Sequence, residues 1–247
     1  MNLSQIQMSF LCLCVTCFVG CSSTKSFLGK ASFSNLGKAK SEQQQFMFDV
    51  ARANEKQGNL EAAETTYLKL IEQSPKDAKI LHRLGVVYSR LETPEEASYY
   101  FREAIKLAPS DSELLTDYGY SLYLNGDLDK ASTILRAAVK ENNQNHRAIN
   151  NLAIVVGLQG NTEESYSLFR QIVSEAEANA NLAYVFAQRG DVESATQGYS
   201  YALSLNEDLD QASMALVQIA QQSSQPHPEL RLASGQTDSS TQAVNSN

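Results

Sequence analysis

The chain has 247 residues, of which 43% are hydrophobic and 19% are charged, and its formal net charge is −8. This acidic balance argues against a sequence-independent nucleic-acid binder, because contacts with phosphates require a basic surface. The length suits one sizeable domain or two small ones, and the absence of Trp together with abundant Ala and Leu favours helix. All four cysteines lie within the first 21 residues, so we expect no disulfide and no cysteine metal site in the rest of the chain.

The N-terminus has the pattern of a secretion signal. Residues 8–20 form an apolar run that is too short to cross a bilayer, which takes about 20 residues, and it fits the apolar region of a signal peptide. The run ends at Phe18-Val19-Gly20-Cys21, which resembles the lipobox of bacterial lipoproteins. The resemblance implies a signal peptide over 1–20, cleavage before the cysteine and lipid attachment to the thiol of Cys21. An uncleaved N-terminal anchor and an ordinary signal peptide with a chance cysteine are the alternatives.

A lipidated cysteine and a flexible linker are expected over residues 21–43. The stretch 22–41 is rich in Ser, Gly and Lys and has no sustained hydrophobic period. Its four lysines could lie along an anionic lipid surface or be solvated. All 28 acidic residues come after position 41, so a short basic stretch leads into an acidic body.

The body of the chain is an internal repeat. Asn59, Thr93, Asp127 and Asn161 are each 34 residues apart, and Asp191 follows after 30. A glycine precedes four of these residues, and glycine favours the left-handed conformation that ends a helix. Asn, Asp or Thr then caps the N-terminus of the next helix, and Thr93 is also followed by a Pro and a Glu suited to a capping box. Each unit therefore predicts two helices joined by a tight turn.

Apolar residues recur in helical spacing around these turns. The second unit shows the pattern best, with Leu84-Gly85, Tyr88, Ala97, Phe101, Ala104 and Pro109. This spacing resembles the tetratricopeptide repeat (TPR), in which small residues permit close helix contact and large ones fill the gap. The resemblance covers residues 44–209 and implies an all-α fold, a right-handed superhelical stack of about five TPR helix hairpins. The units would be 44–77, 78–111, 112–145, 146–175 and 176–209.

The C-terminal part of the stack carries three further signals. The fourth unit is four residues short, so we expect a truncated second helix or following turn there. Residues 209–222 form one more amphipathic helix, whose polar face would cap a superhelix spanning 44–222. Residues 223–247 are polar and aperiodic, which is typical of a disordered tail.

No motif in the sequence points to catalysis, a cofactor or a metal. No Gly-rich phosphate loop and no Gly-x-Ser-x-Gly is present. Three histidines occur, none of them in HExxH-type spacing: His82, His146 and His227. The acidic pairs Glu95-Glu96 and Glu163-Glu164 fall in the first turn of predicted helices, where they favour the helix dipole. We therefore expect no enzyme and no small-molecule substrate, but a protein or peptide partner.

A partner would bind on the inner face of the stack, which the first helix of each pair lines. The TPR resemblance implies that the inward residues flank the core Leu-Gly pair of each unit. Projected on this chain, the face carries Phe48, Arg52, His82, Arg83, Arg90, Tyr120, Tyr123, Asn150, Asn151, Asn181 and Tyr184. Asparagine can donate to and accept from a peptide backbone, tyrosine is a frequent interface anchor, and arginine suits an acidic group or a chain terminus. Alternatively, the asparagines bond within or between helices and some tyrosines belong to the core.

A narrower resemblance rests on the strings Leu115–Tyr120, Asn150–Ala153 and Ala180–Tyr184. Together with the acylated cysteine, they resemble the TadD-like lipoproteins of tight-adherence (Flp-type) pilus systems. That resemblance implies a membrane-anchored scaffold that assists assembly or outer-membrane placement of a secretin-type pore. Ser22 and Ser23 do not resemble an inner-membrane retention signal, which favours the periplasmic face of the outer membrane. A general scaffold for outer-membrane protein assembly, and an accessory or regulatory subunit of a cell-envelope enzyme, are the alternatives.

Overall fold

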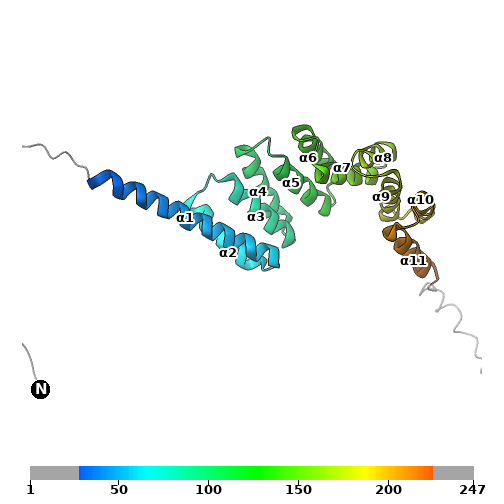
Figure 1. Cartoon of the computed structure of the whole chain (residues 1–247), viewed down its shortest axis with the longest axis horizontal. Coiled ribbons are helices and arrows are strands. Elements are labelled where there is room, and N and C mark those ends of the chain that lie inside the picture. Colours follow the sequence, from blue (N-terminus) through cyan, green and yellow to red (C-terminus); the bar gives the residue numbers. More distant parts are fainter. Residues whose placement is uncertain (1–27, 225–247) are drawn as a thin grey trace, which may run out of the picture. The chain divides into compact units, whose positions relative to one another are not determined.

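The computed structural model describes residues 28–224, and these residues form eleven α-helices and no strand. The chain divides into two compact units, one ending at Gln45 and one beginning at Phe46, and the repeats lie in the second. Figure 1 labels the helices in chain order. Their bounds are α1 (Leu28–Gln57), α2 (Leu60–Gln73), α3 (Ala78–Arg90), α4 (Pro94–Leu107), α5 (Ser112–Leu124), α6 (Leu128–Glu141), α7 (His146–Leu158), α8 (Thr162–Arg170), α9 (Glu175–Gln188), α10 (Val192–Leu205) and α11 (Asp210–Ser224).

The flexible linker predicted over 21–43 is wrong from Leu28 onward, where α1 begins. The stretch has no long apolar period, but it also has no proline, and much of it consists of Lys, Ala, Leu and Ser. Once the end of α1 is held by packing in the repeats, each residue added at its N-terminus gains a hydrogen bond without a new nucleation step. The signal peptide (1–20), Cys21 and residues 225–247 of the predicted tail lie outside the described residues.

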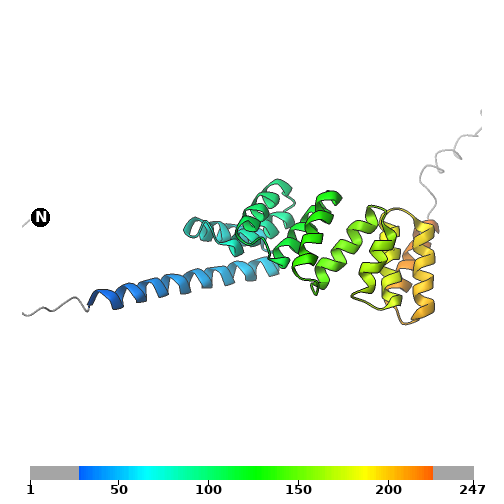
Figure 2. The ribbon, with the colours of Figure 1, turned by 90° about the horizontal axis from the view of Figure 1, so that it is seen from above.

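Five helix pairs follow one another in the second unit. The end of α1 packs on α2, and the pairs α3–α4, α5–α6, α7–α8 and α9–α10 follow. Figure 2 shows these antiparallel pairs in succession, with α11 after the last. The first helices also touch from pair to pair, α3 on α5, α5 on α7 and α7 on α9. The predicted all-α superhelical stack is therefore confirmed, and its first helices form one continuous row.

The turn inside each hairpin uses the left-handed backbone conformation. Glycine occupies this position in four hairpins, with φ between 77° and 100°. Glu92 occupies it in the second hairpin, with φ of 59°. Because a Cβ crowds the following carbonyl oxygen in this region, only glycine adopts it without strain. The predicted turns therefore form even where the sequence has no glycine.

The caps that follow these turns are only partly as predicted. Asp127, Asn161 and Asp191 accept a hydrogen bond from the backbone N–H three residues later. Thr93 makes no such cap, because its hydroxyl lies 3.2 Å from the carbonyl oxygen of Tyr88 and donates to it. The capping box predicted at Thr93 is therefore wrong, although a Pro does begin α4.

Small residues allow the two helices of a hairpin to touch. A Cβ built on Gly85 would lie 2.8 Å from ring carbons of Phe101, and one built on Gly119 would lie 2.5 Å from Leu135. Both large partners are fully buried. Such distances are shorter than any normal carbon contact, so a side chain at either glycine would push the helices apart.

The fourth hairpin has the truncated second helix that its length predicts. α8 contains nine residues, whereas α6 and α10 contain 14 each. A short turn follows, and the next helix starts with a capping box between Ser174 and Glu177. The Ser174 hydroxyl accepts from the Glu177 N–H at 3.3 Å, and the Glu177 carboxylate accepts from the Ser174 N–H at 2.9 Å. α9 is therefore well capped at its start, and it packs on α7 in the row of first helices.

The last helix, α11, packs on α10 and buries Ala212 against the fifth hairpin. The sequence predicts a polar outer face for this helix. In the structure, however, Met214 is 71% exposed and Val217 is 56% exposed. The terminal helix therefore covers the core of the stack but presents large apolar side chains of its own. None of the helices within residues 28–224 has the length and hydropathy needed to span a membrane.

Candidate functional site

One position of each first helix recurs on the same face of the row. Arg83, Asp117, Asn151 and Asn181 occupy it in α3, α5, α7 and α9. The first two of these side chains are charged, whereas the last two are uncharged amides. The face therefore has a charged part on α3 and α5 and a neutral part on α7 and α9. The surroundings of these side chains differ between the two parts.

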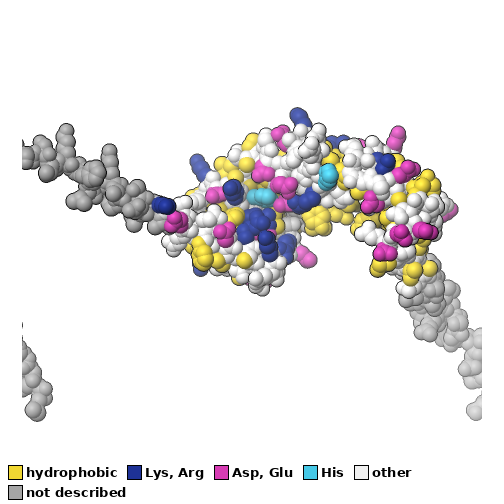
Figure 3. All heavy atoms as spheres, in the orientation of Figure 1, with side chains coloured by type: hydrophobic (Ala, Val, Ile, Leu, Met, Phe, Trp, Pro, Cys, Tyr) yellow, Lys and Arg dark blue, Asp and Glu magenta, His cyan; other side chains and the backbone are white. Residues whose placement is uncertain are grey.

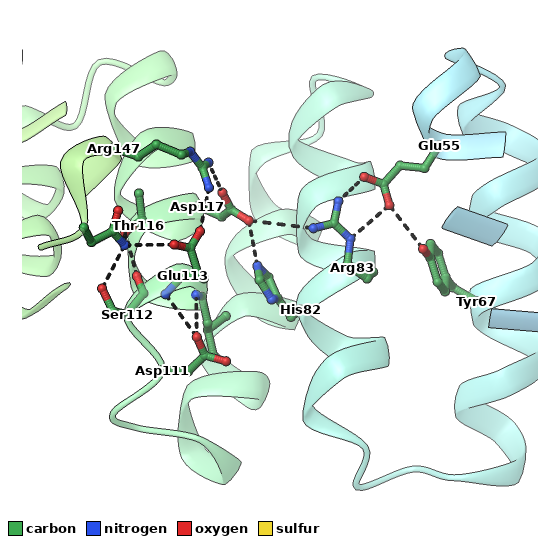
Figure 4. A network of polar contacts seen from close by, with 12 residues as sticks. Glu55, Tyr67, His82, Arg83, Asp111, Ser112, Glu113, Thr116, Asp117 and Arg147 are labelled. Carbon is green, nitrogen blue, oxygen red and sulfur yellow. Dashed lines mark hydrogen bonds and ion pairs between the residues drawn. The ribbon is translucent and has the colours of Figure 1, made fainter. Parts of the chain in front are cut away.

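The charged part begins at a buried carboxylate. Glu55, on α1, is 5% exposed and contacts Arg83 through both of its oxygens, with Arg83 Nε donating at 2.9 Å. The Tyr67 hydroxyl donates to the same carboxylate at 3.1 Å, and Arg90 donates to the backbone oxygen of Glu55 at 2.7 Å. Burial and the neighbouring Glu55 raise the pKa of Tyr67 well above its usual value, so its hydroxyl remains a donor. Figure 4 shows the Arg83 guanidinium and the Tyr67 hydroxyl meeting at the Glu55 carboxylate.

The charges continue from Arg83 along α5 and α7. Asp117 Oδ2 lies 2.8 Å from His82 Nε2 and 3.8 Å from the Arg83 guanidinium, while Arg147 donates to Asp117 Oδ1 at 2.6 Å (Figure 4). Arg147 also donates to Glu113 at 2.7 Å. Burial alone would raise the pKa of Asp117, but hydrogen bonds from His82 and Arg147 outweigh it and hold that pKa below its usual value.

We call this set of side chains the charged network; it comprises Glu55, His82, Arg83, Glu113, Asp117 and Arg147. Figure 3 shows basic and acidic side chains gathered around a histidine on this face, over α3 and α5. Each basic group within it has an acidic partner from another helix. The arginines predicted to take an acidic group of a partner are therefore engaged inside the protein: Arg83 by two carboxylates and Arg90 by a backbone oxygen.

The neutral part of the face contains a pocket of about 860 Å³ between α7, α9 and α11. None of its lining residues is charged. They are Asn150, Ile154, Phe169, Ala180, Asn181, Tyr184, Tyr199, Gln211, Ser213, Met214, Ala215, Val217, Gln218 and Gln221, and we call it the amide-lined pocket. The two exposed apolar side chains of α11, Met214 and Val217, belong to this wall.

Only some of the predicted asparagines line this pocket. Asn150 and Asn181 line it, whereas Asn151 does not, although Asn151 and Asn181 share a repeat position. Among the described residues, none forms a side-chain hydrogen bond with Asn150 or Asn181. Their amides are therefore available to a bound molecule.

Tyrosines connect the amide-lined pocket with α5. Tyr184 and Tyr120 are 42% and 43% exposed, and the Tyr120 and Tyr123 rings are 5.9 Å apart. Burial, followed by the influence of the Tyr184 and Tyr120 phenols, raises the pKa of Tyr123. The three predicted tyrosines thus form one aromatic strip from α5 to α9.

Two predicted residues of the first unit lie elsewhere. Phe48 packs edge-on against Tyr67, with ring centroids 5.6 Å apart, and belongs to the core of the first hairpin. Arg52 is half-buried, and its charge opposes, without reversing, the rise that burial and Glu55 cause in the pKa of Tyr67. The sequence prediction missed Glu55, Asp117 and Arg147. Asp117 could have been found, because it follows Arg83 by one repeat length with the opposite charge.

Comparisons with known proteins identify the repeat. Family models described as tetratricopeptide repeat match residues 30–78 and 90–153. No curated protein sequence matches the chain. Among solved structures, YrrB, described as a TPR protein with an unusual peptide-binding site, is 22% identical with a TM-score of 0.56, over 74% of this chain and 97% of that one. PilF of Pseudomonas aeruginosa is 18% identical with a TM-score of 0.57, over 74% of this chain and 93% of PilF. A tetratricopeptide repeat protein from Parabacteroides merdae has a TM-score of 0.58 at 16% identity, with 72% of each chain covered.

Proposed function

We propose that this chain, a tetratricopeptide repeat protein, is anchored in a bacterial cell envelope and holds a segment of a partner protein against its row of first helices. The tetratricopeptide repeat fold indicates a protein-interaction scaffold rather than an enzyme. The observation that carries the proposal is the neutral part of the face, where exposed tyrosines and unpaired asparagine amides surround a pocket. A peptide segment would satisfy the amides and cover the aromatic rings.

The exposed tyrosines allow a direct test in cells. A photo-crosslinking amino acid at position 184 should trap the partner protein, whereas the same residue at position 99 should not. Tyr99 is the matched control, because it is 54% exposed but lies on α4, a second helix, away from the row of first helices. In binding assays with the trapped partner, Tyr184→Ala should weaken affinity about tenfold or more, as expected for an aromatic anchor. Equal crosslinking or equal loss at position 99 would contradict the proposed face.

The membrane anchor is proposed from the sequence alone. The apolar run over 8–20 followed by Gly20-Cys21 resembles a lipoprotein signal, and an acylated cysteine would hold the stack at a membrane surface, with about 0.8 kcal/mol gained per buried CH₂. Ser22 and Ser23 favour the periplasmic face of the outer membrane.

A labelling experiment tests the anchor. Cells grown with a radiolabelled fatty acid should incorporate label into the wild-type chain and none into Cys21→Ala. Cys17→Ala, four residues earlier in the apolar run, is the control and should label normally. Label that persists in Cys21→Ala would remove the lipoprotein assignment without affecting the partner-binding face.

We further propose a role in assembly of a pilus or secretion complex, in line with the TadD-like resemblance of the sequence. PilF, whose fold resembles this chain, supports the idea only at the level of architecture, because the two share 18% identity. The alternative is an accessory or regulatory subunit of a cell-envelope enzyme or of an outer-membrane assembly machine. Neighbouring genes discriminate between them: pilus ATPase and secretin genes beside this one support the pilus role.

A further inference from the structure

We propose that the amide-lined pocket takes an uncharged, extended segment of the partner protein, with an aliphatic or aromatic side chain inserted between α9 and α11. The inference rests on the proposed function, since it names the chemistry of the segment that the face would hold. It also assigns a role to α11, which forms a second wall of the site as well as closing the stack.

The lining of the pocket offers no counter-ion to a charged segment. None of its lining residues is charged. The nearby arginines of the first helices are in the charged network, where each already contacts a carboxylate. A carboxylate of a partner would therefore lose its water without gaining a counter-ion, which is strongly unfavourable. An ammonium inside the pocket finds no counter-ion among the lining residues, because the acidic Glu177, Asp208 and Asp210 line a neighbouring hollow instead. A neutral segment loses only the hydration of its peptide groups.

The polar groups of the pocket match those of a peptide backbone. Asn150 comes from α7, Asn181 from α9, and Gln211 and Gln218 from α11. Each side chain offers two N–H donors and one carbonyl acceptor, the same pair of functions that a peptide unit needs. Among the described residues, none forms a side-chain hydrogen bond with any of these four. Amides on opposing helices could therefore bond to both edges of a strand lying between them.

The apolar groups of the pocket provide the anchor position. Met214 and Val217 project from α11 with 71% and 56% of their surfaces exposed, and Tyr184 faces the same pocket from α9. Methionine adapts its shape to different apolar partners. The volume, about 860 Å³, falls within the range of sites that enclose a ligand of several residues' bulk. An aliphatic or aromatic side chain of the segment would cover the apolar surface that α11 otherwise leaves in water.

The test selects peptides from a random dodecapeptide phage-display library on the immobilised full chain. We expect the selected peptides to be depleted in Asp, Glu, Lys and Arg and enriched in Leu, Ile, Met and Phe. The dissociation constant of a selected peptide should change less than about twofold between low and high salt, because no charge pair is formed. Selection of acidic or basic peptides, or selection of none, would overturn the proposal.

Isosteric charge variants then locate the site. Asn181→Asp and Asn150→Asp should each weaken a selected peptide about tenfold, because they place an unpaired carboxylate beside a dehydrated segment. Asn206→Asp is the matched control: its side-chain oxygen accepts from the Asp208 N–H at 3.1 Å outside the pocket, as an aspartate oxygen would, and it should leave affinity unchanged. Circular dichroism should show equal helix content in all three variants.

The outcomes separate this inference from the proposed function. Acidic peptides whose binding is lost in Arg147→Ala would refute the neutral pocket but keep the row of first helices as the binding face. Peptides insensitive to every inner-face variant would refute both. If sedimentation shows a dimer that Met214→Lys converts to a monomer, a second copy of the chain covers α11 and the inference fails.

Discussion

Replacing Glu55 with alanine should lower the free energy of unfolding by about 3–5 kcal/mol, the usual cost of removing one partner from a buried ion pair. The Glu55 side chain is 7% exposed and that of Arg83 is 14% exposed, so neither charge has water to replace the other. The change also leaves the buried Tyr67 hydroxyl without its acceptor. Denaturant unfolding followed by circular dichroism measures the loss.

A matched pair at the surface provides the control for Glu55. Glu164 accepts two hydrogen bonds from Arg136 on another hairpin, a similar geometry, but the Arg136 side chain is 52% exposed. Glu164→Ala should therefore cost no more than about 1 kcal/mol. In a double-mutant cycle, adding Arg83→Ala to Glu55→Ala should cost less than Arg83→Ala alone. Equal losses for Glu55→Ala and Glu164→Ala would show that burial of the first pair has no energetic consequence.

The fold of this chain could be predicted from the sequence because its signals are local and repeated. A turn residue followed by a cap, and small residues facing large ones, specify each hairpin without reference to the rest of the chain. Glu92 shows the strength of this pattern, since the second turn forms with a strained glutamate in the glycine position. α1 shows the limit, because its extension to Leu28 depends on a helix already fixed further along rather than on its own hydrophobic period.

The candidate site was less predictable, because it depends on distances between repeats. Repeat position identified the face, but it could not show that Arg83 would be neutralised by Glu55 and Asp117. It also placed both Asn150 and Asn151 on this face, whereas only Asn150 lines the pocket. The sequence did not show that α11 lines the pocket, because its exposed apolar residues, such as Met214, recur with the same helical spacing as its core residues.

Replacing Asp117 with asparagine should lower the free energy of unfolding at neutral pH by about 2–3 kcal/mol. The Asp117 side chain is 16% exposed and faces His82 and Arg83 from α3 and Arg147 from α7. Without its negative charge, the two cations and the imidazole lie around a neutral group. Glu113→Gln is the matched control. It also removes a carboxylate from Arg147, but both side chains of that pair are 59% exposed, so the loss should stay below about 1 kcal/mol.

The same variant should also change how stability depends on pH. The folded-state pKa of Asp117 is lowered, so the carboxylate stabilises the fold fully above its unfolded pKa near 3.8, and this contribution is lost as pH falls through the lower folded pKa. The difference in unfolding free energy between wild type and Asp117→Asn should therefore shrink as pH falls below about 4. Other carboxylates titrate in both proteins and cancel in the difference. A difference that stays constant down to pH 2 would mean that Asp117 stabilises the stack through its shape and hydrogen bonds, which asparagine disturbs, and not through its charge.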